Sequence, residues 1–143
     1  MDDAKLGAKY LNVDLEIRSR SDLKPLADAV ATQLLVLHVG RMRGEFFLSL
    51  EMSDPSRLPD AAIRHLAHVI SSLPPSVHKL WTQARDRVFD VGLEATHEDT
   101  AFALALRPET VRMVARLNAR IAVTVYPTTT KRQRRPTRRS RKS

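Results

Sequence analysis

Polar and apolar residues alternate one by one in the stretch YLNVDLEIRS, at residues 10–19. A period of two places alternate side chains on opposite faces of a β-strand, so the stretch predicts a strand with one buried and one wet face. Such a strand belongs in a sheet that is covered on one side only, as antiparallel sheets commonly are. The predicted buried positions are Leu11, Val13, Leu15 and Ile17, and the predicted wet ones are Asn12, Asp14, Glu16 and Arg18.

The rest of the chain contains further strand and helix patterns. Apolar residues that recur every three or four positions predict helices, and short apolar or alternating runs between turn residues predict strands. Pro25 and Pro108 fit the first turn of a helix, where the missing N–H costs little. Helices are predicted at residues 22–34, 60–72, 76–84 and 108–117. Further strands are predicted at residues 34–39, 45–52, 87–95, 101–107 and 120–127.

This order of elements, β-α-β-β-α-α-β-β-α-β, predicts an α+β fold. The part up to residues 89–93 has the βαββαβ order of a ferredoxin-like unit, and a further ββαβ-type segment extends it. Short turns between neighbouring strands favour a two-layer sandwich, with a mostly antiparallel six-stranded sheet and the helices on one face. We expect a single α+β domain at residues 1–127 and a disordered basic tail at residues 128–143.

Four stretches of the chain resemble small, uncharacterised bacterial α+β proteins of an immunity-like type: KYLNVDLEIRS, SDLKPLADAV, LHV and VTVYP. The likeness covers about residues 8–127 and rests on the strand pattern rather than on a diagnostic motif. The resemblance implies a small cytoplasmic protein, and it assigns no catalytic residues.

The positive charge of the chain is concentrated at its C-terminal end. Eight of the 24 Lys and Arg residues lie in the tail, and the 16 that remain equal the 16 Asp and Glu residues, none of which is in the tail. The formal net charge of +8 therefore belongs to the tail, and residues 1–130 are neutral overall. The tail is a candidate polyanion-binding segment. Its cations are Lys131, Arg132, Arg134, Arg135, Arg138, Arg139, Arg141 and Lys142.

The wet side of the predicted sheet carries mainly carboxylates. RNA-binding sheets present aromatic side chains for stacking and cations for phosphate, whereas carboxylates repel phosphate. The pattern therefore indicates a docking face for a basic protein, or else an ordinary solvated sheet face. We call this surface the candidate face; its residues are Asn12, Asp14, Glu16, Ser49, Glu51, Asp90 and Glu94.

Motifs for catalysis and for phosphate binding are missing from the sequence. The chain has no cysteine and only four glycines, and it lacks the GxSxG, P-loop and GxGxxG patterns. His65 and His68 lie three residues apart but would need further ligands to hold a metal, so a solvated histidine pair is favoured. The turn at residues 97–99 offers acid and base groups, as turns commonly do for conformational reasons. We expect no catalytic residues, no metal and no cofactor.

Together these observations predict a small cytoplasmic, non-enzymatic binding protein. The first hypothesis is an immunity-like protein-interaction module that recognises an unknown protein partner through the candidate face. The alternative is a nucleic-acid-associated protein that binds non-specifically through its Arg- and Lys-rich tail. No apolar run approaches the length that a membrane span needs, so we expect no membrane partner.

Overall fold

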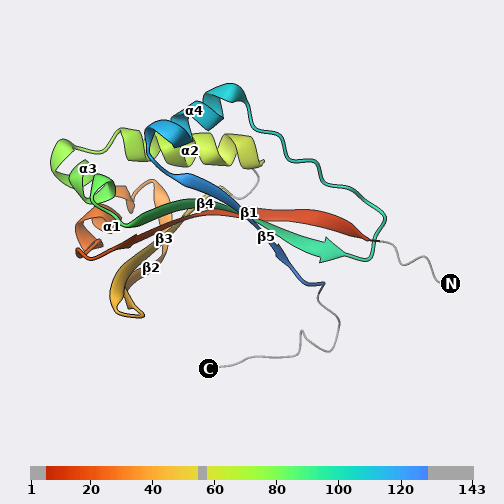
Figure 1. Cartoon of the computed structure of the whole chain (residues 1–143), viewed down its shortest axis with the longest axis horizontal. Coiled ribbons are helices and arrows are strands. Elements are labelled where there is room, and N and C mark those ends of the chain that lie inside the picture. The colour runs from red at the N-terminus through yellow and green to blue at the C-terminus, as the bar shows by residue number, and fades with distance from the viewer. Residues whose placement is uncertain (1–5, 55–57, 129–143) are drawn as a thin grey trace.

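A five-stranded sheet carries four helices on one of its faces in the computed structural model, which describes residues 6–54 and 58–128 (Figure 1). The α+β class predicted from the sequence is therefore confirmed. The elements are β1 (Gly7–Ser19), α1 (Lys24–Val30), β2 (Leu34–Met42), β3 (Glu45–Met52), α2 (Pro59–Ser71), α3 (Pro75–Thr82), β4 (Asp86–Thr96), α4 (Pro108–Arg116) and β5 (Arg120–Tyr126).

The strands lie in the order β2-β3-β1-β4-β5. The neighbours β2/β3, β3/β1 and β1/β4 are antiparallel, and β5 alone runs parallel to its neighbour β4. A parallel pair needs a long connection, which residues 97–107 and α4 supply by crossing over the sheet (Figure 1). The sheet is therefore mostly antiparallel, as predicted, with one parallel edge strand.

Local sequence signals explain where most elements begin and turn. Asp22 accepts a hydrogen bond through Oδ1 from the backbone N–H of Lys24, at 2.9 Å, and so stabilises the turn that leads into α1. A proline stands in the first turn of every helix. The β2–β3 hairpin turns at Arg43 and Gly44, whose φ angles of 55° and 85° are the positive values that a tight two-residue hairpin requires.

One apolar core lies between the sheet and the helices. Alternate residues of β1 are buried on the helix side, as the alternation in YLNVDLEIRS predicts, and residues of the other strands meet the helix stripes there. The core side chains with no measurable exposure include Leu15, Ile17, Leu26, Val30, Leu48, Leu50, Ile63, Leu66, Ile70 and Phe89. The other face of the sheet is left without a covering layer by the described residues (Figure 1).

A buried arginine joins two helix ends to the sheet. Arg87, near the start of β4, is only 9% exposed. Its Nη1 donates to the carbonyl oxygens of Trp81 and Ala84, at 2.9 and 2.7 Å, and its Nε donates to that of Asn118, at 2.9 Å. Trp81 strengthens the same junction, because its Nε1 donates to the carbonyl oxygen of Leu117 at 2.9 Å. The C-terminal ends of α3 and α4 are thereby fixed to β4.

The predicted sixth strand, at residues 101–107, is not present. This segment is extended but pairs with no strand, and it forms part of the connection between β4 and α4. Its large residues Phe102, Leu104 and Leu106 pack on the core while the alanines between them are exposed, and the ring of Phe102 stacks on Tyr10 with centroids 5.7 Å apart. The alternation at residues 101–107 therefore arises because one side of an extended segment packs on the core, and it does not show that the segment is a strand of the sheet.

The first strand also departs from the predicted pattern at one residue. The register between β1 and β4 shifts between Tyr10 and Asn12, which places an extra residue, Leu11, in a β-bulge. As a result Leu11 is 36% exposed, and Tyr10 packs against the core in its place. The prediction that Leu11 is buried was therefore wrong, whereas Val13, Leu15 and Ile17 are buried as expected.

Candidate binding face

The uncovered side of the sheet brings most of the candidate face together. In the strand register, Asp14 lies opposite Glu51 of β3 on one side and opposite Asp90 of β4 on the other. Glu16 lies one outward position further along β1, opposite Ser49. Four carboxyl groups from three adjacent strands therefore share one central area of the sheet, although the three strands are far apart in the sequence.

Two polar side chains hold the carboxylates in place. Asn12 Nδ2 donates to Glu51 Oε2 at 2.6 Å and to Asp14 Oδ1 at 3.3 Å. Thr124 of β5 donates through Oγ1 to the carboxylate of Asp90, with distances of 2.8 and 3.1 Å to its two oxygens. The Thr124 hydroxyl and the Asn12 amide donate some of the hydrogen bonds that these carboxylates can accept. Both donors are uncharged, so they do not neutralise the negative charge.

A glycine gives these side chains room. A Cβ atom at Gly92 would lie 2.8 Å from Asn12 Oδ1 and 3.6 Å from Tyr126 Cε2. The first of these distances is shorter than real Cβ contacts allow. The missing side chain at position 92 therefore lets Asn12 of β1 and Tyr126 of β5 approach each other over β4.

Crowding of the carboxylates changes their affinity for protons. Burial first, and then the charges of Glu51, Glu16 and Asp90, together raise the pKa of Asp14 from its usual value of 3.8 to about 6. Burial also raises the pKa of Glu16, with a further contribution from Asp90. The pKa of Tyr126 is raised by burial first and then by the same carboxylates. The centre of the candidate face therefore has a strongly negative local field.

We expect the replacement Asp14→Asn to stabilise the protein at pH 7. Because the folded-state pKa of Asp14 lies above its usual value, the folded chain holds this proton more tightly than the unfolded chain, and stability falls as the pH rises from about 4 to about 6. The neutral amide removes this loss of folding stability. After allowance for solvent screening, the gain in the free energy of unfolding at pH 7 is about 1 kcal/mol. Thermal unfolding at pH 4 and pH 7 measures it: the wild-type melting temperature should fall more across this interval than that of the variant.

The variant Glu109→Gln provides the control for this measurement. Glu109 lies in the first turn of α4 with a side chain that is 60% exposed, away from the candidate face. Removal of the Glu109 charge should leave the change in melting temperature between pH 4 and pH 7 the same as in the wild type. An unchanged melting temperature for Asp14→Asn at pH 7 would contradict the argument from burial and crowding.

One end of the uncovered sheet face carries two arginines, Arg18 and Arg120, which lie outside the predicted candidate face. Arg18 continues the outward positions of β1, and its guanidinium lies over the ring of Phe47, 4.4 Å from the centroid. Arg120 of β5 pairs with Asp86 of β4 through two hydrogen bonds of 3.0 and 3.1 Å. The alternation in β1 already pointed Arg18 outward, whereas the approach of Arg120 to Asp86 depends on the parallel pairing of β4 with β5.

The remaining candidate residues differ in how they are placed. Ser49 lies at an outward register position but is only 7% exposed, so it offers little surface to a partner. Glu94 lies one outward position beyond Gly92, opposite Lys9 of β1 and beside Tyr126 of β5. The tail cations Lys131–Lys142 lie outside the described residues, and the described chain reaches Thr128, whose Oγ1 donates to the carbonyl oxygen of Ala95 at 2.9 Å.

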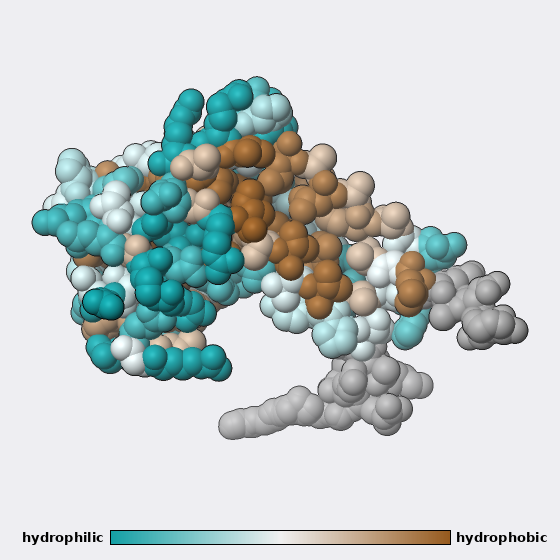
Figure 2. Space-filling model, viewed as in Figure 1, coloured by the Kyte–Doolittle hydropathy of each residue, from teal (hydrophilic) through white to brown (hydrophobic). Residues whose placement is uncertain are grey.

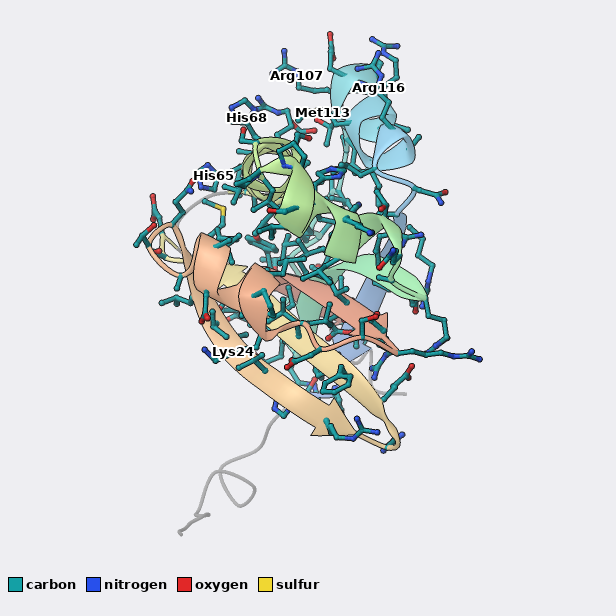
Figure 3. The ribbon with its side chains drawn as sticks, turned by 90° about the vertical axis from the view of Figure 1, so that its left-hand side faces the viewer. Lys24, His65, His68, Arg107, Met113 and Arg116 are labelled. Atoms are coloured by element: carbon teal, nitrogen blue, oxygen red, sulfur yellow. The ribbon has the colours of Figure 1, made fainter. Side chains whose placement is uncertain are left out.

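The histidine pair lies on the opposite side of the molecule from the candidate face. His65 and His68 of α2 border an open hollow of about 360 Å³, together with Met113 of α4 (Figure 3). Within residues 6–54 and 58–128, no group of three or more His, Cys, Asp or Glu side chains is arranged to hold a metal ion. His97, Glu98 and Asp99 are exposed in the turn after β4, as the sequence predicts for polar turn residues.

The fold and this surface define an α+β protein with an open, negatively charged sheet face. Comparison of the chain with family models, with curated protein sequences and with solved structures found no match. None of the helices in the described ranges has the length and apolar character needed to cross a membrane.

Proposed function

We propose that this chain is a non-enzymatic, immunity-like protein-binding module that holds a cationic protein surface against the candidate face. The observation that carries the proposal is the group of four carboxylates at the centre of the uncovered sheet face. Within the described part of the chain, Asp14, Glu16, Glu51 and Asp90 form no ion pair at salt-bridge distance. The fold therefore gathers negative charge on a rigid surface and leaves it for a partner to neutralise.

The energetics of such a face favour a basic partner. Burial and mutual repulsion make the ionised form of Asp14 costly, as its raised pKa records. A guanidinium or ammonium group placed among the carboxylates would relieve the repulsion and lower this pKa again. Complementary charge also speeds association and rejects acidic partners, including nucleic acids. Binding near pH 6 should accordingly release protons.

A three-site charge reversal tests the proposal. We expect the variant Asp14→Lys/Glu16→Lys/Glu51→Lys to lose binding of an oligolysine peptide, because the peptide then meets cations where the carboxylates were. Titration of the isotope-labelled full chain by NMR measures both the affinity and the place of binding. In the wild type, shifts should centre on the outward residues of β1, β3 and β4.

A matched control separates this surface from overall charge. The variant Asp22→Lys/Asp28→Lys/Glu109→Lys changes the net charge by the same amount at three exposed positions at α1 and α4, away from the sheet face. It should keep the wild-type pattern of shifts. Equal loss of binding in both variants, or equal retention in both, would mean that the candidate face does not select the cationic probe.

The second candidate function is non-specific binding of nucleic acid through the tail. Eight cations with no acidic residue among them favour this activity, since neutralised phosphates release their counterions. The negative field of the candidate face opposes phosphate, so nucleic acid would contact the tail and not the sheet. The two functions use different parts of the chain and are tested separately.

The strand order also supports a finer description of the fold. We propose that β1 to β4 with their helices form a ferredoxin-like unit, to which β5 is added at one edge. The support is the order β2-β3-β1-β4 with every neighbouring pair antiparallel. In this description the candidate face is the uncovered side of the unit, and β5 extends it.

A further inference from the structure

The last strand leaves one edge of the sheet without protection. β5 pairs with β4, and among the described residues no strand covers its other edge. Natural proteins usually blunt such edges with bulges, prolines or charges, because unpaired backbone groups attract further strands. The opposite edge strand, β2, has a register shift between Val36 and His38. β5 has no register shift in its pairing with β4, and its sequence RIAVTVY has one charge, at the first residue.

The exposed side chains of this edge are apolar. Val123 and Val125 are 49% and 58% exposed, although they point to the helix side of the sheet, where the helices do not reach them. The segment at residues 101–106 contributes Phe102, Leu104 and Leu106, which pack on the core but remain partly exposed. We call these five residues the apolar band. Figure 2 shows a continuous apolar area over this part of the molecule, and contiguous exposed areas of this kind commonly mark interaction sites.

We propose that β5 pairs antiparallel with β5 of a second copy of this chain, around a two-fold axis at Val123. In this register Val123 faces its own equivalent, and Ile121 faces Val125 of the second copy, so the helix side gains one uninterrupted row of β-branched residues. On the other side Ala122 faces Thr124 of the second copy. The side chain of Arg120 faces the Tyr126 ring of the second copy, a favourable cation–aromatic pair. No like charges meet along the strand.

The residue sequence of β5 favours a second copy of the chain over other candidates for binding at this free edge. The basic tail would find no carboxylate on RIAVTVY, and the cationic partner proposed for the candidate face would find none either. Pairing of β5 with β2 of another copy would join two different edges, so chains could keep adding to form an open-ended assembly. Antiparallel β5–β5 pairing joins two identical edges and gives a closed dimer. The helix side of the strand is also its own complement, because reversing the strand about Val123 places Ile121 opposite Val125 and Val123 opposite its own equivalent.

Single-cysteine variants test the register directly, since the chain has no cysteine of its own. Residues directly opposite in an antiparallel pair have Cα atoms about 4.5–5.5 Å apart, which suits a disulfide bond. We expect oxidation of Val123→Cys to give a disulfide-linked dimer. The variant Val125→Cys should give little, because its cysteine faces Ile121 of the second copy. The control Leu37→Cys lies on the other edge strand with an equal exposure of 50% and should stay monomeric.

Analytical ultracentrifugation of the full chain supplies an independent measurement. The wild type should sediment as a dimer, and Val123→Lys should be monomeric at the same concentration with an unchanged circular dichroism spectrum, because two ammonium groups would meet at the axis. The control Leu37→Lys should remain dimeric. A monomeric wild type would overturn the proposal. Equal cross-linking of Val123→Cys and Val125→Cys would overturn the two-fold register at Val123, and equal cross-linking of Leu37→Cys would overturn pairing through β5.

Discussion

Replacement of Arg87 by methionine is expected to lower the free energy of unfolding by about 3–5 kcal/mol. The guanidinium is 9% exposed and donates three hydrogen bonds to the carbonyl oxygens of Trp81, Ala84 and Asn118. Methionine fills a similar volume but donates none of these bonds, and each buried carbonyl oxygen that loses a donor carries a desolvation cost. The positive charge also lies at the C-terminal ends of α3 and α4, where it favours the helix dipoles. Urea denaturation at neutral pH measures the change.

The neighbouring residue Arg85 provides a matched control for this experiment. Its side chain is 55% exposed and forms a two-bond ion pair with Glu45, at 2.8 and 2.9 Å. Exposed pairs of this kind contribute little, so Arg85→Met should cost about 1 kcal/mol or less. Comparable losses in the two variants would show that Arg87 does not hold the helix ends in the way that its hydrogen bonds indicate.

The contrast between these two arginines shows what a sequence pattern can predict. In β4 the residues Phe89, Val91 and Leu93 alternate inward, and the same parity places Arg87 inward as well. The charge of arginine nevertheless argues for exposure when only composition is considered. Its burial depends on carbonyl oxygens at the ends of two helices, and the positions of these ends are set by packing that no local pattern contains.

The order and positions of the elements were largely predictable from local signals. Period-two alternation located β1 and β4, prolines located helix starts, and the glycine-containing turn located the β2–β3 hairpin. The failure at residues 101–107 has a physical cause. An extended segment lying on a core alternates as a strand does, and whether its backbone pairs with another strand depends on tertiary placement.

The sequence predicts which side chains point to the candidate face, but it does not predict which of them lie next to one another. Outward positions of β1 follow from alternation, so Asp14 and Glu16 could be placed on one face from the sequence. That Asp14 lies between Glu51 and Asp90 follows only from the strand order β3-β1-β4. The raised pKa of Asp14 results from this three-strand juxtaposition and is therefore a property of the topology.

The proposed dimer would affect binding at the candidate face. Antiparallel β5–β5 pairing keeps outward residues of both copies on the same side of one continuous sheet. The two carboxylate clusters would then face one partner surface, and simultaneous contact would strengthen binding well beyond that of one copy. A cationic partner should accordingly bind the monomeric variant Val123→Lys more weakly than the wild type, although Val123 points to the helix side.

Deletion of residues 131–143 is expected to reduce binding of DNA and RNA to background while leaving the thermal unfolding of the domain unchanged. The deleted segment holds eight cations, and the residues that remain have as many acidic as basic side chains. Binding by about six to eight cations should weaken by roughly 10³–10⁵ between 50 and 200 mM salt, because each neutralised phosphate releases counterions. Mobility-shift measurements with the full-length and shortened chains, on several unrelated duplexes at low and moderate salt, determine both effects.

A chain whose tail residues are shuffled within positions 131–143 is the sharpest control for this deletion. Counterion release depends on the number of cations and little on their order, so the shuffled chain should bind as the full-length protein does and with the same dependence on salt. If the shortened chain still bound one sequence tightly, the folded domain would carry the specificity, and the acidic character proposed for its sheet face could not be its main recognition property. If the full-length chain failed to bind even at low salt, the second candidate function would be excluded, since eight cations that attract no polyanion under those conditions do not serve that purpose.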